Sequence, residues 1–387
     1  MRRLKVMLVA GEASGDLHGS YLAKEILRQQ PDTRLMGMGG TLMKEAGVRL
    51  LFNPTSISTI GFLEALRGVQ VLRRVLLKLG EIVDRQQPDV VVLIDFPGFN
   101  MRFAEILKRK GIPSVYYFSP SAWAWGRGRA EKVAQTVTKI VSVWPFEYDV
   151  YKEAGADVEF VGHPLLDIVP ERIPRDEARR MLGLPEDVPL IALLPGSRSQ
   201  EIKAHLSIML KAVKLLGRKV PGVEPVVAAA QSTPVEEIRK LSGGSWDNIH
   251  VIQGQTYGVL SAVDLALVAC GTATLETALL GVPQVAIYRI SPSTYYVAKM
   301  LVRIPYIALP NIVAGREIIP ELLQNDSTPE NIAVHLERIW REDERRRIEA
   351  DYAELRRKLG EGGAIAKAAR IVLDIARQGR GTGENQS

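Results

Sequence analysis

Residues 5–16 read KVMLVAGEASGD, and this stretch decides the fold class of the chain. An apolar run at 5–10 has the composition of a strand, the glycine-bounded turn 11–16 follows, and a helical pattern covers 17–29. A strand that turns directly into a helix is the first half of a βαβ unit, so the stretch predicts a parallel sheet covered by helices. The turn lacks the G-x-G-x-x-G spacing of a dinucleotide site.

The same alternation of strand-like runs and helical patterns recurs in two series along the chain. Segment 167–189 separates them, and its four prolines and many charges indicate a connection. We therefore predict an α/β protein with two doubly wound parallel-sheet domains that face a cleft, where ligands meet the carboxyl ends of the strands. The predicted strands are 5–10, 90–94, 114–117, 139–143 and 159–161, then 190–194, 224–229, 250–252, 265–268 and 284–287.

The domain boundaries follow from these patterns. We expect one domain over residues 1–167 and a second over 168–345. Helices rich in Arg, Glu and Ala over 346–378 should pack back toward the first domain. The polar, Gly-rich end, 379–387, is expected to be disordered.

The composition excludes several classes of protein. Of 387 residues, 46% are hydrophobic and 24% charged, the net charge is +6, and Cys270 is the one cysteine. A single cysteine allows no internal disulfide and favours a reducing, cytoplasmic setting. Five histidines without an H-E-x-x-H pattern give no indication of a catalytic metal, although an Asp/Glu magnesium site stays open. No nucleic-acid-binding motif accompanies the basic charge, and no apolar run is long enough to span a membrane.

Two turns of the first series carry candidate chemistry. Glu12 and Ser14 lie in the turn after the first strand, where free backbone N–H groups favour anions. Asp95 directly follows the strand 90–94, and partial burial there would raise its pKa toward that of a general base. The alternatives are structural: Ser14 or Asp16 could cap the first helix, and Asp95 or Asn100 the later one.

The first turn of the second series reads LPGSRSQE at 194–201. The backbone at Gly196 and the hydroxyl of Ser197 could reach phosphate oxygens, and Arg198 could neutralise a diphosphate. The alternative is a capping box between Ser197 and Glu201, one residue off the usual spacing.

A second turn in this series reads CGTATLETALLGVP at 270–283. Gly271 and Thr272 open a helix whose N-terminus suits a diphosphate, and Thr274 follows. Glu276, one turn along, suits the two hydroxyls of a ribose. The alternative is an ordinary capped helix with an acid in its first turns.

Three further segments have ambiguous patterns. Residues 62–83 form an amphipathic helix with basic residues beside its apolar stripe, which fits either a membrane surface or the core. Segment 294–303 has the same ambiguity. Trp123 and Trp125 could pack on a sugar or an acyl chain, or anchor their loop in the core.

Seven segments, in order from about residue 4 to about residue 325, resemble lipid-A-disaccharide synthases, a bacterial glycosyltransferase family of the GT-B fold. The resemblance implies two Rossmann-like domains, the first binding the lipid acceptor and the second the UDP-sugar donor. The matching segments are AGEASGD (10–16), IDFPGFN (94–100), SPSAWAW (119–125), FVGHP (160–164), LPGSR (194–198), GTATLE (271–276) and LPNIVAGRE (309–317).

The resemblance also implies a reaction. UDP-2,3-diacylglucosamine gives its sugar, with inversion, to the 6-hydroxyl of 2,3-diacylglucosamine 1-phosphate (lipid X), and the products are the β-1,6-linked lipid A disaccharide 1-phosphate and UDP. No metal or cofactor is implied. Asp95 matches the family's proposed base. The substrate-binding residues that we predict are Glu12, Ser14, Gly196, Ser197, Arg198, Gly271, Thr272, Thr274, Glu276 and Asn311. One departure is Gly98, where some members have a second acid.

The family context favours a peripheral membrane protein. Both substrates are acylated, so we expect the helix Phe62–Val83 to dock on the inner face of the cytoplasmic membrane; a homodimer is possible by resemblance. Two other classes stay open from the residues themselves, a UDP-sugar 2-epimerase-like enzyme and a non-catalytic nucleotide-sugar-binding protein.

Overall fold

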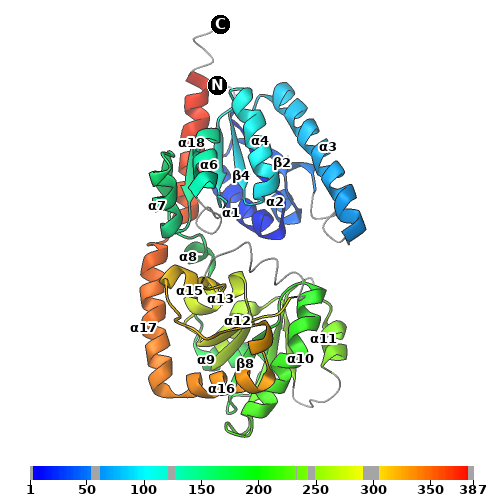
Figure 1. Ribbon diagram of the computed structural model, residues 1–387, viewed down its shortest axis with the longest axis vertical. Coiled ribbons are helices and arrows are strands. Elements are labelled where there is room, and N and C mark those ends of the chain that lie inside the picture. Colours follow the sequence, from blue (N-terminus) through cyan, green and yellow to red (C-terminus); the bar gives the residue numbers. More distant parts are fainter. Residues whose placement is uncertain are drawn as a thin grey trace. The chain divides into compact units, whose positions relative to one another are not determined.

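The computed structural model describes residues 3–53, 62–120, 127–231, 233–242, 249–290 and 305–381. The chain divides into two compact units, Met1–Asp167 with Leu359–Ser387, and Ile168–Lys358 (Figure 1). The helix α17 (Glu342–Leu359) belongs almost wholly to the second unit, and α18 (Ala364–Gly381) belongs to the first. The chain therefore returns to the first unit near residue 359 rather than at the expected residue 346. The helix α18 also continues past 379, where a disordered tail was expected to begin.

The first unit is built on a seven-stranded sheet in the order β3-β2-β1-β4-β5-β6-β7, in which every pair of neighbours is parallel. The order reverses between β1 and β4, which is the switch point where doubly wound sheets bind ligands. The strands are β1 (Lys5–Ala10), β2 (Arg34–Met38), β3 (Arg49–Phe52), β4 (Val90–Ile94), β5 (Ser114–Tyr117), β6 (Lys139–Ser142) and β7 (Val158–Phe160).

Helices cover both faces of this sheet (Figure 1). Alternate residues of a strand point to opposite faces. Thus Leu8 and Val92 pack with α1 and α18, whereas Met7 and Val91 pack with α3 and α4. The helices are α1 (Ala13–Gln29), α2 (Thr41–Glu45), α3 (Phe62–Gln86), α4 (Pro97–Arg109), α6 (Arg127–Thr136), α7 (Pro145–Glu153), α8 (Leu165–Ile168) and α18.

The second unit repeats the plan with a six-stranded parallel sheet in the order β10-β9-β8-β11-β12-β13, which reverses between β8 and β11. Its strands are β8 (Leu190–Leu194), β9 (Glu224–Ala229), β10 (His250–Gln253), β11 (Leu265–Ala269), β12 (Gln284–Tyr288) and β13 (Glu321–Leu323). Its helices are α9 (Arg175–Leu182), α10 (Ser199–Leu216), α11 (Val235–Leu241), α12 (Thr256–Ala262), α13 (Thr272–Leu279), α15 (Leu309–Ala314), α16 (Pro329–Trp340) and α17, with a short 3₁₀ turn, η2 (Gln324–Asp326).

A buried ion pair ties α9 to this sheet. Arg179 is 1% exposed, and its guanidinium contacts Asp264 Oδ2 at 3.1 Å. The same oxygen accepts the backbone N–H of Leu190 at the start of β8. Nε donates to the carbonyl of Ala262 and one terminal nitrogen donates to those of Glu186 and Val188, so each guanidinium nitrogen has a hydrogen-bond partner.

The helix α3 packs on the core through part of its stripe. Val75, Leu79 and Val83 are buried against the sheet, whereas Leu77 is 59% exposed. The side chains of 62–70 lie outside the described part, as do Trp123, Trp125 and segment 294–303. None of the described helices is long and apolar enough to cross a membrane.

Candidate active site

Asp95 stands at the carboxyl end of β4, beside the switch point of the first unit. Asp95 and the following Phe96 both have left-handed backbone, with φ of 49° and 48°, a conformation that is costly for residues other than glycine. Two buried side chains stabilise this backbone conformation. The carbonyl of Asp95 accepts hydrogen bonds from Asn100 Nδ2 at 2.7 Å and from the Tyr116 hydroxyl at 2.9 Å. Neither Asp95 nor Asn100 caps α4, because Phe96 occupies the N-cap position.

The carboxyl group of Asp95 is partly buried. Burial raises its pKa above the usual aspartate value, partly offset by hydrogen bonds from the Phe96 backbone and from Ser14. The Ser14 hydroxyl lies 3.3 Å from Asp95 Oδ2. The structure therefore brings together one residue from the turn 11–16 and the candidate base.

The glycine at the start of that turn is needed for close packing. A Cβ built on Gly11 would lie 2.1 Å from Cδ1 of Phe96, far inside van der Waals contact. The Phe96 ring can rest on the turn only because residue 11 has no side chain.

Asp16 and Glu12, in the same turn, make contacts with the ends of two helices. The Asp16 carboxylate accepts the backbone N–H groups of Gly40, Met43 and Leu42 at 2.7, 3.0 and 3.1 Å, so it fixes the start of α2. Glu12 is exposed and occupies the N-cap position of α1. The capping roles considered for Ser14 and Asp16 at α1 are therefore not the ones observed.

Two histidines that were not predicted from the sequence pack against aromatic rings. His18 of α1 stacks on Phe118 with ring centroids 4.0 Å apart, and the ring centroids of His163 and Trp144 are 4.3 Å apart. Burial lowers the pKa of His18 to about 4 and that of His163 to about 3, so both rings are neutral at pH 7. The segment FVGHP thus contributes a packing residue.

The turn after β8 carries an exposed cation. The Arg198 side chain is 75% exposed, and its guanidinium lies 3.3 Å from Glu201 Oε1. The other Glu201 oxygen accepts the backbone N–H groups of Ser197 and Arg198 at 3.1 and 3.2 Å. The carboxylate of Glu201 therefore accepts the backbone N–H groups that we predicted for a phosphate oxygen. The N-cap of α10 is Arg198 rather than Ser197. Gly196, with φ of 112°, leaves room for Glu201.

A neutral histidine joins this turn to the end of β12. The backbone N–H of Arg289 donates to His205 Nε2 at 3.1 Å. Nε2 is therefore the acceptor, so Nδ1 carries the proton and donates to the carbonyl of Pro195 at 2.9 Å. Sequence reasoning gave no role to His205, which lies two turns into α10.

The turn after β11 presents the N-terminus of α13. Gly271 and Thr272 are exposed there, but Thr274 is fully buried and its hydroxyl donates to the Gly271 carbonyl at 2.8 Å. Glu276 is partly buried and accepts the Tyr257 hydroxyl at 2.8 Å, and burial raises its pKa. Thr274 therefore shapes the turn, whereas Gly271, Thr272 and Glu276 remain candidates for substrate contact.

Asn311 also has a structural position. It is fully buried; its Oδ1 accepts the N–H groups of Ile318 and Ile319 at 2.8 and 3.0 Å, and its Nδ2 donates to the Ile319 carbonyl at 3.0 Å. Both ends of the amide are used within the loop, so direct contact with a nucleotide would require these bonds to break.

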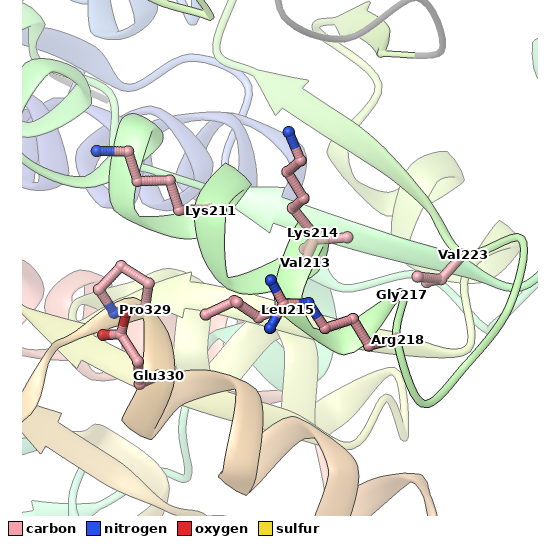
Figure 2. Close-up of a pocket in the computed structure, with 9 residues that line it drawn as sticks. All are labelled: Lys211, Val213, Lys214, Leu215, Gly217, Arg218, Val223, Pro329 and Glu330. Carbon is pink, nitrogen blue, oxygen red and sulfur yellow. The ribbon is translucent and has the colours of Figure 1, made fainter.

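A separate cavity of about 620 Å³ lies in the second unit (Figure 2). Its walls include Lys211, Lys214 and Arg218 near the C-terminal end of α10. Arg198 precedes α10, so the helical rise places Lys211 roughly 20 Å away from it. The cavity contains none of the predicted site residues. Within the described residues, no three His, Cys, Asp or Glu side chains gather as a metal site would require.

Two doubly wound parallel sheets, each reversing its strand order at a switch point, define the GT-B fold class. The fold is similar to the glycotransferase of kitacinnamycin (TM-score 0.65, 14% identity, 97% of this chain and 100% of that one). It is also similar to a UDP-N-acetylglucosamine 2-epimerase from Listeria monocytogenes (TM-score 0.61, 14% identity, 94% of each chain). At such identities the likeness shows the fold alone.

Sequence comparison identifies the family. Residues 6–375 match the family model described as lipid-A-disaccharide synthetase. The lipid-A-disaccharide synthase of Syntrophus aciditrophicus (strain SB) is 40% identical over 375 residues, which are 96% of this chain and 98% of that protein. The chain belongs to the lipid-A-disaccharide synthetase family, and it is a hexosyltransferase with the GT-B fold.

Proposed function

We propose that this chain transfers 2,3-diacylglucosamine from UDP to the 6-hydroxyl of 2,3-diacylglucosamine 1-phosphate. The products are the β-1,6-linked disaccharide 1-phosphate and UDP, a step in lipid A biosynthesis. The observation that carries the proposal is the family match over residues 6–375. The position and burial of Asp95 support the chemistry.

Asp95 acts as the general base in this proposal. Its carboxylate takes the proton from the 6-hydroxyl as that oxygen attacks the anomeric carbon on the face opposite UDP, so one displacement inverts the configuration. Its burial and raised pKa suit proton transfer, and the hydrogen bonds from Asn100 and Tyr116 keep its backbone in place. Ser14 and Glu12 position the sugars beside it.

The second unit binds the leaving group. The exposed guanidinium of Arg198 and the N-terminus of α13 at Gly271 and Thr272 stabilise the negative charge that develops on the diphosphate. Glu276 accepts hydrogen bonds from the ribose hydroxyls. Glu201 accepts hydrogen bonds from the N–H groups after β8, and in this proposal the nucleotide competes with it for them.

The exposed face of α3 supports docking on the inner face of the cytoplasmic membrane. Arg73, Arg74, Leu77 and Lys78 are exposed and recur at helical spacing, so one face combines cations with an apolar side chain. Leu72 and Leu76 pack partly against the core, which makes Leu77 the cleaner probe. Leu77→Asp should release the folded protein from anionic vesicles in flotation, while Leu42→Asp, at a second exposed leucine, should not. Unchanged binding of Leu77→Asp would count against docking.

The enzymatic proposal is tested with UDP-2,3-diacylglucosamine, with and without the monosaccharide acceptor. A glycosyltransferase releases UDP only when the acceptor is present. An epimerase would alter the UDP-sugar without it, and a binding protein would release nothing. Light scattering of the purified chain tests the homodimer that the family resemblance implies.

A further inference from the structure

Two adjoining cavities of the first unit are lined in part by the residues that directly follow Asp95 along the chain. One, of about 200 Å³, lies between α3 and α4; its walls are mainly apolar, with Leu72, Leu76, Phe96 and Phe99, and also include Arg73 and Arg102. The other, of about 400 Å³, lies between α4 and α6. Both include Gly98 and Arg102, so they meet at the first turns of α4, directly after the candidate base. A Cβ at Gly98 would find no atom within 4 Å, so the junction is open.

The larger cavity is cationic. Arg102 of α4 and Arg129 and Lys132 of α6 contribute three positive charges, and Glu105 contributes one negative charge. Lys132 contacts Glu105 at 2.8 Å while remaining 62% exposed, so its ammonium still reaches solvent. The cavity therefore carries a net charge of about +2, which matches the charge of roughly −1.5 to −2 on a phosphate monoester at pH 7.

We propose that this cationic cavity binds the phosphate monoester of the acceptor, and that the apolar cavity beside it receives the acyl chain on the neighbouring carbon. The inference rests on the acceptor named in the proposed function. In that sugar the phosphate on C1 and the acyl group on C2 are adjacent, just as the two cavities adjoin at Arg102. The reacting 6-hydroxyl is on the exocyclic carbon attached to C5, which is joined to C1 through the ring oxygen, and the proposal turns it toward Asp95.

The placement has a chemical consequence. With the phosphate held by Arg102, Arg129 and Lys132, fewer orientations of the acceptor remain at Asp95. The cavity therefore contributes to the choice of O6 as the nucleophile, through orientation of the sugar rather than through contact with the reacting atoms. Anionic phospholipid headgroups share the phosphate chemistry, and the experiment must separate the two sources.

The test compares two acceptors in neutral detergent micelles, lipid X and the same diacylglucosamine without its phosphate. The variants are Arg102→Ala, Lys132→Ala and the double variant. Each single change should raise the KM for lipid X about 10-fold, the range for loss of one charge-assisted hydrogen bond, and the effects should accumulate. The KM for the donor and the kcat/KM for the unphosphorylated acceptor should stay within about twofold. Arg102→Lys should recover part of the loss.

Arg109→Ala is the matched control. Arg109 lies on the same helix, is exposed, and sits seven residues after Arg102, about 10 Å further along, outside both cavities. It should leave both acceptors unaffected. Thermal melting of each variant confirms that it is folded.

Three results would overturn the inference: equal losses with both acceptors, no loss with either, or a loss seen only as weaker partition onto phosphatidylglycerol vesicles. The last would assign the cations to a membrane headgroup. Failure of the proposed function looks different, because the unmodified chain would then form no disaccharide from either acceptor.

Discussion

The packing of Gly11 against Phe96 gives a sharp test of how Asp95 is held. In Gly11→Ala the new Cβ would lie 2.1 Å from Phe96 Cδ1, whereas ordinary contact begins near 3.4 Å. The ring must therefore move by at least 1.3 Å, the difference of those two distances. Phe96 directly follows Asp95 and shares its left-handed backbone, so the carboxylate should move with it.

A misplacement of about 1 Å costs on the order of 100-fold in rate, and overpacking costs about 1–3 kcal/mol in stability. We therefore expect kcat of Gly11→Ala to fall about 100-fold, measured as acceptor-dependent UDP release, with little change in the KM for the donor. The melting temperature should fall by a few degrees only.

The matched control is Gly80→Ala in α3, where the new Cβ meets Ile106 at an ordinary 3.6 Å. It should keep full activity and gain stability slightly, because alanine restricts the unfolded chain. If Gly11→Ala folds and retains its full kcat, the account of a rigidly held base is wrong.

Four further predictions follow from the site and the fold. Asp95→Asn should lower kcat by about 10²- to 10⁴-fold while UDP binding, measured calorimetrically, is retained. Because burial raises the pKa of Asp95, kcat/KM should decline as the pH falls through a value above the usual ~3.9 of aspartate, as a pH–rate profile would show. Arg198→Ala should reduce kcat by about 100-fold with a melting temperature unchanged, since its side chain is exposed; a drop in stability instead would refute the assignment. Arg179→Ala should destabilise the second unit by about 3 kcal/mol in urea unfolding, because Asp264 would keep only the half-exposed Arg175 as a charged partner and the carbonyls of Ala262, Glu186 and Val188 would each lose a hydrogen bond.

Much of the fold was predictable from local pattern. Apolar runs followed by glycine-containing turns correctly placed ten strands to within a residue or two, and the α/β class with two parallel sheets is confirmed. The missed strands are β2, β3 and β13. Gly37 interrupts the apolar run of β2, and it is required because a Cβ there would lie 1.7 Å from the Leu8 carbonyl oxygen of β1. The other two, β3 and β13, are edge strands of four and three residues.

The candidate site was predictable in position but less so in role. A carboxylate after a buried strand is visible in sequence, so Asp95 could be found. The side chains that stabilise the Asp95 backbone could not be predicted, because Tyr116 lies on another strand and its contact with Asp95 depends on strand order. Thr274 and Asn311 stand in the expected turns, but sequence does not reveal whether a polar side chain points outward or satisfies buried backbone groups.

The measurement that most directly tests the central claim is the mass of the product formed from UDP-2,3-diacylglucosamine and 2,3-diacylglucosamine 1-phosphate. We predict a disaccharide 1-phosphate in equal amount to the UDP released by the unmodified chain, and none from Asp95→Asn. A UDP-sugar altered without acceptor, or a disaccharide made at full rate by Asp95→Asn, would contradict the account.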